Sequence, residues 1–333
     1  MEAFRLANAA LAIDIFKNLN EKNKTESFIF SPFCISSSLA LAFKGAKGNT
    51  ATEIEKEFIN SIKKPYPSEL EQIDIKSQPE EAKNQINTSI KDLTNGNVKN
   101  LLTEGLINEN TNMLLLGAAS YKGSWLYKFN KSETKECEFH VTKTETKKVE
   151  MMQLDARLSI RTLNEQNLMI LDIPFAGKQM SMLIIMPKSI EDDSTGLEKL
   201  EKELTSENYV KLTNPSMMGN SKVKLSFPKF KIESSHTLKD NLKSLGINDA
   251  FNEEVADFSV LSEKKGLSVS EAIYRASIDV DEEGSEAADV IRERVLMSKT
   301  ECNVNHPFLF TVKHNKTQGI LFFGRFTGPP VLS

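Results

Sequence analysis

The histidines and cysteines of this chain are the residues best suited to chemistry, yet none stands in a catalytic or metal-binding pattern. The four histidines form no His-Glu-x-x-His pair, and no nucleophile elbow is present. Cys34, Cys137 and Cys302 lack metal-ligand spacing, and their odd number indicates free thiols folded in a reducing environment. His306, which precedes Pro307, is more consistent with a structural role. We therefore predict that the protein is not an enzyme and has no catalytic residues, metal or cofactor.

Composition excludes two further classes of function. Lysine and arginine total 42 against 46 aspartates and glutamates, a net charge of −4, so no broad basic surface favours nucleic acid. No apolar stretch reaches membrane-spanning length, which argues against membrane insertion. The first residues, Met1 to Asn8, begin acidic and carry no secretory signal, so we expect synthesis in the cytoplasm.

A long polar segment between two strand patterns is the most informative part of the chain. Ala276–Val280 precedes this segment and Leu309–Val312 follows it. Both have the β-branched or alternating residues that are typical of strands. Between them lie acidic residues, a glycine, small residues and then basic ones. A loop of this length inside a globular domain usually has a function.

This segment resembles the reactive loop of the serpin family. Glu283-Gly284-Ser285-Glu286-Ala287-Ala288, followed by Asp289, resembles the loop hinge, and His306-Pro307-Phe308 resembles the strand start that follows it. Other family motifs occur in order along nearly the whole chain: Phe30-Ser31-Pro32, Gly123-Ser124-Trp125, Phe227-Pro228-Lys229-Phe230 and Phe322-Phe323-Gly324-Arg325. The segment 191–200 is similar to the intracellular, ovalbumin-like branch. The resemblance implies one α+β domain over residues 1–333, with a large mixed central sheet, smaller sheets, several helices and an exposed reactive loop.

Local patterns agree with that fold. Helices are predicted from Ser31-Pro32 to Gly45, from Thr50 to Lys63 and from Glu80 to Leu93, and strands dominate the second half. Thr50 and Glu53 have the spacing of a capping box, in which each side chain bonds the backbone of the other.

The chain departs from the family at a junction after Phe58. Serpins carry several dozen residues here, comprising a helix, a central strand of the main sheet and most of another helix. Without that strand, neighbouring strands must close up or the fold is weakened, because unpaired backbone groups are costly when buried. An alternative transcript and an incomplete gene model are both open explanations.

Two positions at the centre of the main sheet also differ. Family members usually carry asparagine and histidine, a pair that helps to hold the sheet shut, where this chain has Gly117 and Tyr274. In one interpretation, the larger aromatic ring of Tyr274 fills the space of the side chain that is lost at Gly117, so that the total volume is conserved. In the other interpretation, the two substitutions arose by neutral drift and have no structural role.

The hinge itself is only half preserved. Inhibitory serpins trap a protease when the cleaved loop inserts as a new strand, and the family register then buries Ser285, Ala287, Asp289 and Ile291. An unpaired buried carboxylate costs several kcal/mol, so Asp289 opposes insertion.

Three basic residues, Arg292, Arg294 and Lys299, are candidate bait for a trypsin-like protease, since a lone cation fills an acidic specificity pocket. Arg294 is preferred, because Arg294-Val295-Leu296 matches a basic-aliphatic-aliphatic segment in the loop of a member of this branch. An equally weighted interpretation is that these three residues are ordinary solvated charges.

The leading hypothesis is a non-inhibitory serpin that acts by binding proteins. The resemblance implies roles in epithelial adhesion and suppression of invasion, with extracellular-matrix or cell-surface receptor partners, a monomeric state and leaderless export of some molecules. The alternative is an inhibitor that traps a trypsin-like serine protease, and a third hypothesis is a compromised isoform without a function of its own.

Overall fold

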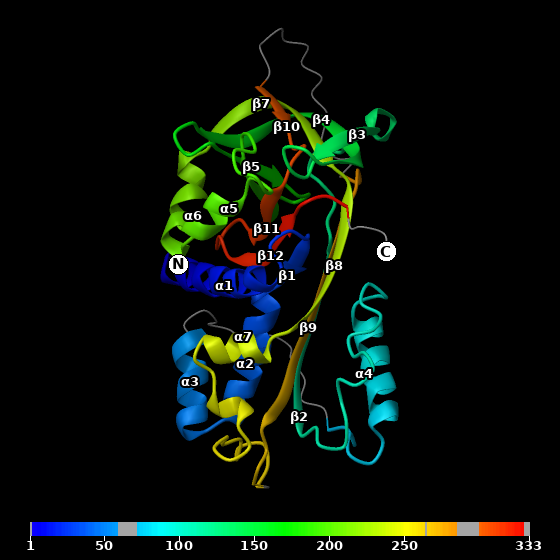
Figure 1. Cartoon of the computed structure of the whole chain (residues 1–333), viewed down its shortest axis with the longest axis vertical. Coiled ribbons are helices and arrows are strands. Elements are labelled where there is room, and N and C mark those ends of the chain that lie inside the picture. The colour runs from blue at the N-terminus through cyan, green and yellow to red at the C-terminus, as the bar shows by residue number, and fades with distance from the viewer. Residues whose placement is uncertain (1, 59–71, 264, 285–299, 330–333) are drawn as a thin grey trace.

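A computed structural model describes residues 2–58, 72–263, 265–284 and 300–329. Within them, two sheets and a set of helices form an elongated molecule (Figure 1). One sheet has nine strands. Eight of them run in the order β1-β12-β11-β6-β5-β4-β7-β10, and β3 pairs with β4. Their bounds are β1 Phe28–Phe30, β3 Lys135–His140, β4 Thr146–Leu163, β5 Leu168–Pro174, β6 Met180–Pro187, β7 Gly219–Pro228, β10 Thr300–Asn303, β11 Phe308–His314 and β12 Ile320–Phe326.

The second sheet has few strands among the described residues, but these strands are long. It consists of β2 (Met113–Lys122), β9 (Val269–Val280) and β8 (Phe230–Thr237), in the order β2-β9-β8. β2 and β9 are parallel, whereas β8 and β9 are antiparallel, so the sheet is mixed as predicted. It corresponds to the main sheet expected from the sequence, with three strands in the described part of the chain.

Helices cover both faces of this sheet. α4 (Pro79–Leu93) lies on one side, and α2 (Pro32–Gly45), α3 (Gly48–Phe58) and α7 (Lys239–Ser244) lie on the other (Figure 1). The remaining helices are α1 Glu2–Lys22, α5 Glu198–Glu203 and α6 Ser206–Leu212, with short 3₁₀ turns at 131–133, 215–217 and 249–251. None of the helices in the described residues is long and apolar enough to cross a bilayer.

The start of α2 follows directly from its sequence. Ser31 is the N-cap, and its side chain accepts a hydrogen bond from the backbone N–H of Cys34. Pro32 occupies the first turn, where a missing N–H costs nothing. This cap fixes α2 against the sheet, with Ile35, Ser38 and Leu39 buried.

The predicted capping box is wrong. α3 begins at Gly48, before Thr50, and both side chains bond a distant segment instead. The Thr50 hydroxyl accepts from the N–H of Asp257, while Glu53 accepts from the N–H groups of Asn248 and Asp249. Hydrogen bonds to residues far away in the sequence therefore replace the local bonds of the predicted capping box. The predicted continuation of this helix to Lys63 lies outside the described residues.

Candidate functional site

Gly117 and Tyr274 lie opposite each other at the centre of the β2–β9 pair. The tyrosine ring is buried, and its hydroxyl shares a hydrogen bond with Ser38 of α2. A Cβ atom added at Gly117 would come within 2.6 Å of Tyr274 Cε1 and 2.8 Å of Cys34 Sγ. The ring thus occupies the space that any other residue at 117 would need, which is the geometry expected of a volume-conserving swap.

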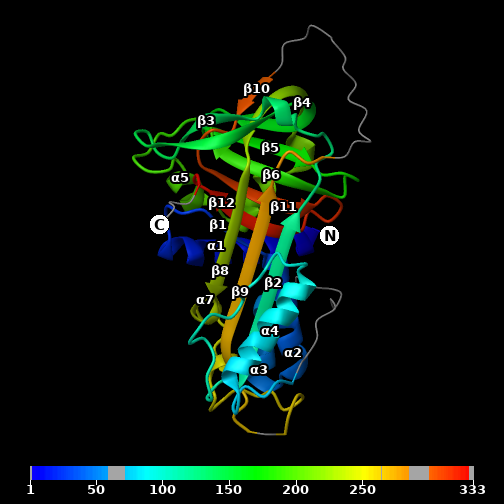
Figure 2. The same cartoon turned by 90° about the vertical axis from the view of Figure 1, so that its right-hand side faces the viewer.

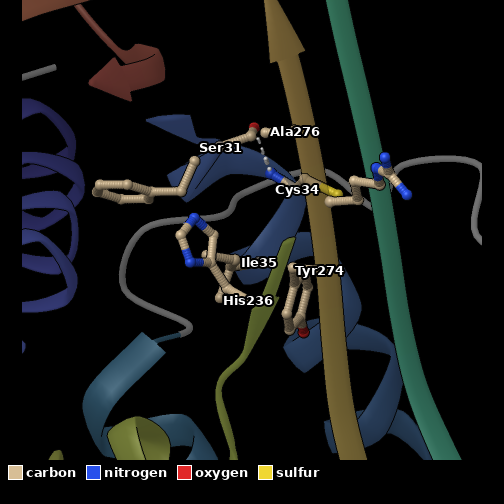
Figure 3. A pocket seen from close by; sticks show the side chains of 8 residues that line it. Ser31, Cys34, Ile35, His236, Tyr274 and Ala276 are labelled. Atoms are coloured by element: carbon tan, nitrogen blue, oxygen red, sulfur yellow. Dashed lines mark hydrogen bonds between the residues drawn. The ribbon is translucent and has the colours of Figure 1, made fainter. Parts of the chain in front are cut away.

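A small cavity adjoins this pair, between β1, α2, β8 and β9 (Figure 3). Its lining includes Ser31, Cys34, Ile35, His236 and Tyr274. The accessible volume is about 10 Å³, room for no more than one water molecule. The cavity is therefore a packing feature of the sheet centre rather than a ligand site.

Burial shifts the pKa values of His236 and Cys34, beside the cavity, in the direction that favours their neutral forms. Burial lowers the pKa of His236, and its hydrogen bond of 2.9 Å to the Ile29 carbonyl only partly opposes this. Burial raises the pKa of the Cys34 thiol to about 11, with a smaller opposing contribution from the Ala118 backbone. A thiol with so high a pKa is a poor nucleophile at neutral pH. Among the described residues, no group of three or more potential ligands could hold a metal ion.

Trp125, which follows β2, is hydrogen-bonded to the start of the segment that resembles a reactive loop. Its indole N–H donates to the Asp281 carbonyl at 2.8 Å, and its backbone N–H donates to the Glu283 carbonyl at 3.0 Å. Gly284 forms a parallel bridge with Trp125, and a Cβ at Gly284 would lie 2.6 Å from the Cα of Lys128. Glycine is therefore required where the hinge crosses this backbone.

Ion pairs reinforce the same place. Lys122 at the end of β2 reaches Asp279 at 3.4 Å and Asp281 at 2.9 Å across the strand pair. The Asp281 carboxylate also accepts from the Glu283 N–H. Burial alone would raise the pKa of Asp281, but hydrogen bonds from Lys122 and Glu283 outweigh it and leave the pKa lowered.

Glu282 is buried and fully engaged on the other side of the loop base. It accepts from the Thr134 hydroxyl at 2.9 Å and pairs with Lys229 at 3.2 Å. Burial tends to raise the pKa of this carboxyl, yet its hydrogen bonds and Lys229 together lower it. Glu283 is exposed and lies 3.6 Å from Lys131.

Two of the predicted hinge residues, Glu283 and Gly284, thus lie at the top of the β2–β9 pair. The rest of the predicted hinge and bait lies outside the described residues: Ser285, Glu286, Ala287, Ala288, Asp289, Arg292, Arg294 and Lys299. Sequence reasoning missed Ser38, Lys122 and Glu282. Nothing in the sequence distinguishes Ser38, because it belongs to a run of three serines. The acidic residues 281–283 lie beside the predicted hinge, and their charge indicates cationic partners such as Lys122.

The structural interpretation of His306 is supported. Its Nε2 bonds the Pro187 carbonyl at 2.6 Å, and burial, partly opposed by this bond, lowers its pKa. The imidazole joins the segment before β11 to the end of β6.

The outer edge of β2 lacks a strand neighbour in the described part of the chain. Residues 72–78, which follow the junction, form no strand, and Ile73 and Ile75 pack instead with α4 residues such as Ala82 and Ile86. Residues 59–71, which border the shortened segment, lie outside the described residues, so the predicted closing-up of the neighbouring strands stays a prediction. Among the described strands, β2 lies at the edge of the three-stranded sheet (Figure 2).

Comparison with known proteins gives a consistent result. A family model described as Serpin (serine protease inhibitor) matches residues 6–57 and 53–329. The serpin B5 of Xenopus tropicalis is 54% identical over 375 residues, covering 99% of each chain. A crystal structure of maspin superposes with a TM-score of 0.90 at 42% identity, covering 99% of each chain. A structure titled as a tumour suppressing serpin gives 0.87 at 40% identity, covering 99% of this chain and 100% of that one.

The same comparison locates the shortened segment. The alignment with the Xenopus protein spans 375 positions and this chain has 333 residues, so at least 375 − 333 = 42 positions lie opposite a gap. The family match breaks into two pieces that meet at residues 53–57, next to the junction after Phe58.

Proposed function

The chain belongs to the serpin family, and we propose that it is a maspin-like, non-inhibitory member that acts by binding other proteins. The relatives named serpin B5 and the structure titled as a tumour suppressing serpin support this proposal. By that resemblance the partners are extracellular-matrix or cell-surface proteins, and the process is epithelial adhesion and suppression of invasion. The protein is made in the cytoplasm, and a fraction is exported.

The observation that carries the proposal is the continuous pairing of β2 with β9. Ten residues of β2, from Met113 to Lys122, pair with β9, and the pairing resumes at Trp125 and Gly284. An inserting loop would have to enter between these strands. It would separate Trp125 from the Asp281 and Glu283 carbonyls.

The cost of that separation comes mainly from buried groups. Trp125 is 1% exposed, so an indole N–H that lost its acceptor would cost about 1–3 kcal/mol unless the new strand replaced it. Lys122 is half exposed, and its two ion pairs contribute at most about 1 kcal/mol each. Tyr274 of β9 is in addition held by its hydrogen bond to Ser38 of α2.

Incubation with trypsin-like proteases tests the proposal. A non-inhibitory serpin is cleaved between Arg292 and Lys299 or left intact, and no SDS-resistant complex forms. Thermal unfolding of the cleaved protein should then match that of the intact protein. A covalent complex, or a large rise in Tm after cleavage, would reject the non-inhibitory proposal.

One observation favours the alternative, a suicide inhibitor of a trypsin-like protease. Gly284 already runs parallel to Trp125 beside the end of β2, where an inserting strand would begin. For this alternative, cleavage at Arg294 would drive residues from Ser285 onward into the sheet. The complex assay separates the two functions directly.

A further inference from the structure

Two side chains of β8 bond a single residue of β1 and thereby join the two sheets. The Ile29 N–H donates to the Ser234 hydroxyl at 3.0 Å, and His236 Nε2 donates to the Ile29 carbonyl at 2.9 Å. Ser234 and His236 are two positions apart on β8, so both side chains lie on the same face of that strand. Side chains of β8 therefore satisfy both backbone groups of Ile29.

The bond to Ile29 determines which nitrogen of His236 carries the hydrogen. A carbonyl oxygen can only accept, so Nε2 is protonated and Nδ1 of the neutral ring is not. Among the described residues, Nδ1 has no hydrogen-bond partner. A second proton would therefore place a positive charge on the ring without an acceptor beside the new N–H.

The groups around the imidazole do not compensate such a charge. β1 contributes only Phe-Ile-Phe, with the Phe28 ring edge-on at 6.3 Å between centroids. Tyr274 lies directly opposite in β9, and Cys34 of α2 and Arg275 line the same cavity (Figure 3). Glu233, the one acidic residue of β8, lies on the other face of the strand and pairs with Arg275 at 3.3 Å. These surroundings agree with the lowered pKa of the imidazole, for which burial is the largest cause.

We propose that the contact of Ser234 and His236 with Ile29 is an acid-sensitive latch between the two sheets. Protonation of His236 favours an arrangement in which the imidazolium reaches water, and this requires β8 to move away from β1 at this point. Because Ser234 lies two residues away on the same strand, the same movement breaks its bond to the Ile29 N–H.

The latch bears on the centre of the main sheet through α2. β1 ends at Phe30, and the next residue, Ser31, is the N-cap of α2. The same helix carries Ser38, which bonds the Tyr274 hydroxyl. Separation of β1 from β8 therefore loosens the support of Tyr274. The inference is independent of whether the reactive loop inserts and of which protein the chain binds.

Hydrogen exchange of the Ile29 amide in the full chain tests the latch, because this N–H donates to Ser234. Exchange is measured at pH 7.5 and 5.5 by mass spectrometry with fragmentation and corrected for the intrinsic effect of pH. We expect the opening of Ile29 to increase several-fold at pH 5.5. The increase is at most about tenfold, the limit for one histidine whose pKa in the open form is about 6.5.

Two histidine variants show whether His236 is responsible. His236→Gln retains a side-chain N–H donor but cannot take up a proton, so it should abolish the increase. The matched control is His314→Gln, at the end of β11, which should retain it. Amides of the buried segment Met182–Met186 in β6 are the internal reference and should stay protected at both pH values.

Ser234→Ala covers the case in which His236→Gln does not fold. This variant should raise the opening of Ile29 at both pH values and keep the increase at pH 5.5, because His236 is intact. The proposal would be overturned by an Ile29 opening that does not change with pH in the wild type or in Ser234→Ala. It would equally be overturned by an increase that persists in His236→Gln, or by an equal loss of protection in β6, which would indicate global unfolding.

Discussion

Gly117→Ala is a sharp test of how the sheet centre is packed, because two physical effects predict opposite signs. Gly117 is a strand residue without a positive φ, so nothing in its backbone requires glycine. Replacing a strand glycine with alanine in open space would stabilise the fold by roughly 0.5–1 kcal/mol. The tyrosine ring predicts the reverse.

The expected magnitude follows from the neighbours of the new methyl group. It would lie 2.6 Å from Tyr274 Cε1 and 2.8 Å from Cys34 Sγ, closer than side-chain carbons approach. The ring has little freedom to move, because it is 4% exposed and its hydroxyl is bonded to Ser38. Overpacking of this kind costs about 1–3 kcal/mol. We therefore expect Gly117→Ala to lower the free energy of unfolding by that amount.

A double-mutant cycle assigns the effect to the ring. Tyr274→Ala alone should cost about 3–5 kcal/mol through the cavity it leaves. In the double variant the methyl group has room, so the Gly117→Ala penalty should disappear or change sign. Urea unfolding of the four proteins at one protein concentration measures this, with Tm as a second readout. Additive effects, or a stabilising Gly117→Ala in the wild-type background, would refute the packing argument.

Three further predictions concern the loop and its base. Asp289→Ala should leave the protein unable to form an SDS-resistant protease complex, since the proposed function involves no insertion; appearance of a complex would show that this carboxylate alone had prevented trapping. Trp125→Phe should lower the free energy of unfolding by about 1–3 kcal/mol, because the Asp281 carbonyl loses its donor, and an unchanged urea midpoint would contradict this. Stability should fall as the pH drops below about 6.5, the ordinary histidine pKa. The lowered pKa values of half-buried His236 and buried His306 mean that the unfolded chain binds more protons, so their contribution is complete above that pH and is lost on acidification toward the folded pKa values. Urea midpoints between pH 5 and 8 measure the trend, and His236→Gln should reduce its slope.

Much of the fold could be predicted because local signals and tertiary contacts agree. The Ser31 cap and Pro32 favour a helix start, and the β-branched, alternating residues Ala276–Val280 favour a strand, which the structure extends to Val269–Val280. The hinge glycine was predicted from family resemblance, and the backbone of Lys128 supplies its physical reason.

The remainder depends on contacts between distant segments. Ser38 bonds a residue 236 positions away, and no local pattern encodes that distance. Thr50 and Glu53 have capping-box spacing, yet N–H groups near residues 248–257 compete for their oxygens more effectively. The partial exposure of β2 likewise depends on distant segments, because no described strand lies beside its outer edge.

The position of Trp125 gives the protein an intrinsic optical reporter. It is the only tryptophan in the sequence, stacks on Phe175 at 4.5 Å and donates its indole N–H to the loop base at Asp281. Emission excited at the tryptophan band therefore arises from one buried ring bonded to the start of the reactive loop. A red shift or a change in quenching on cleavage or partner binding would register movement of that loop base in real time, in unlabelled wild-type protein.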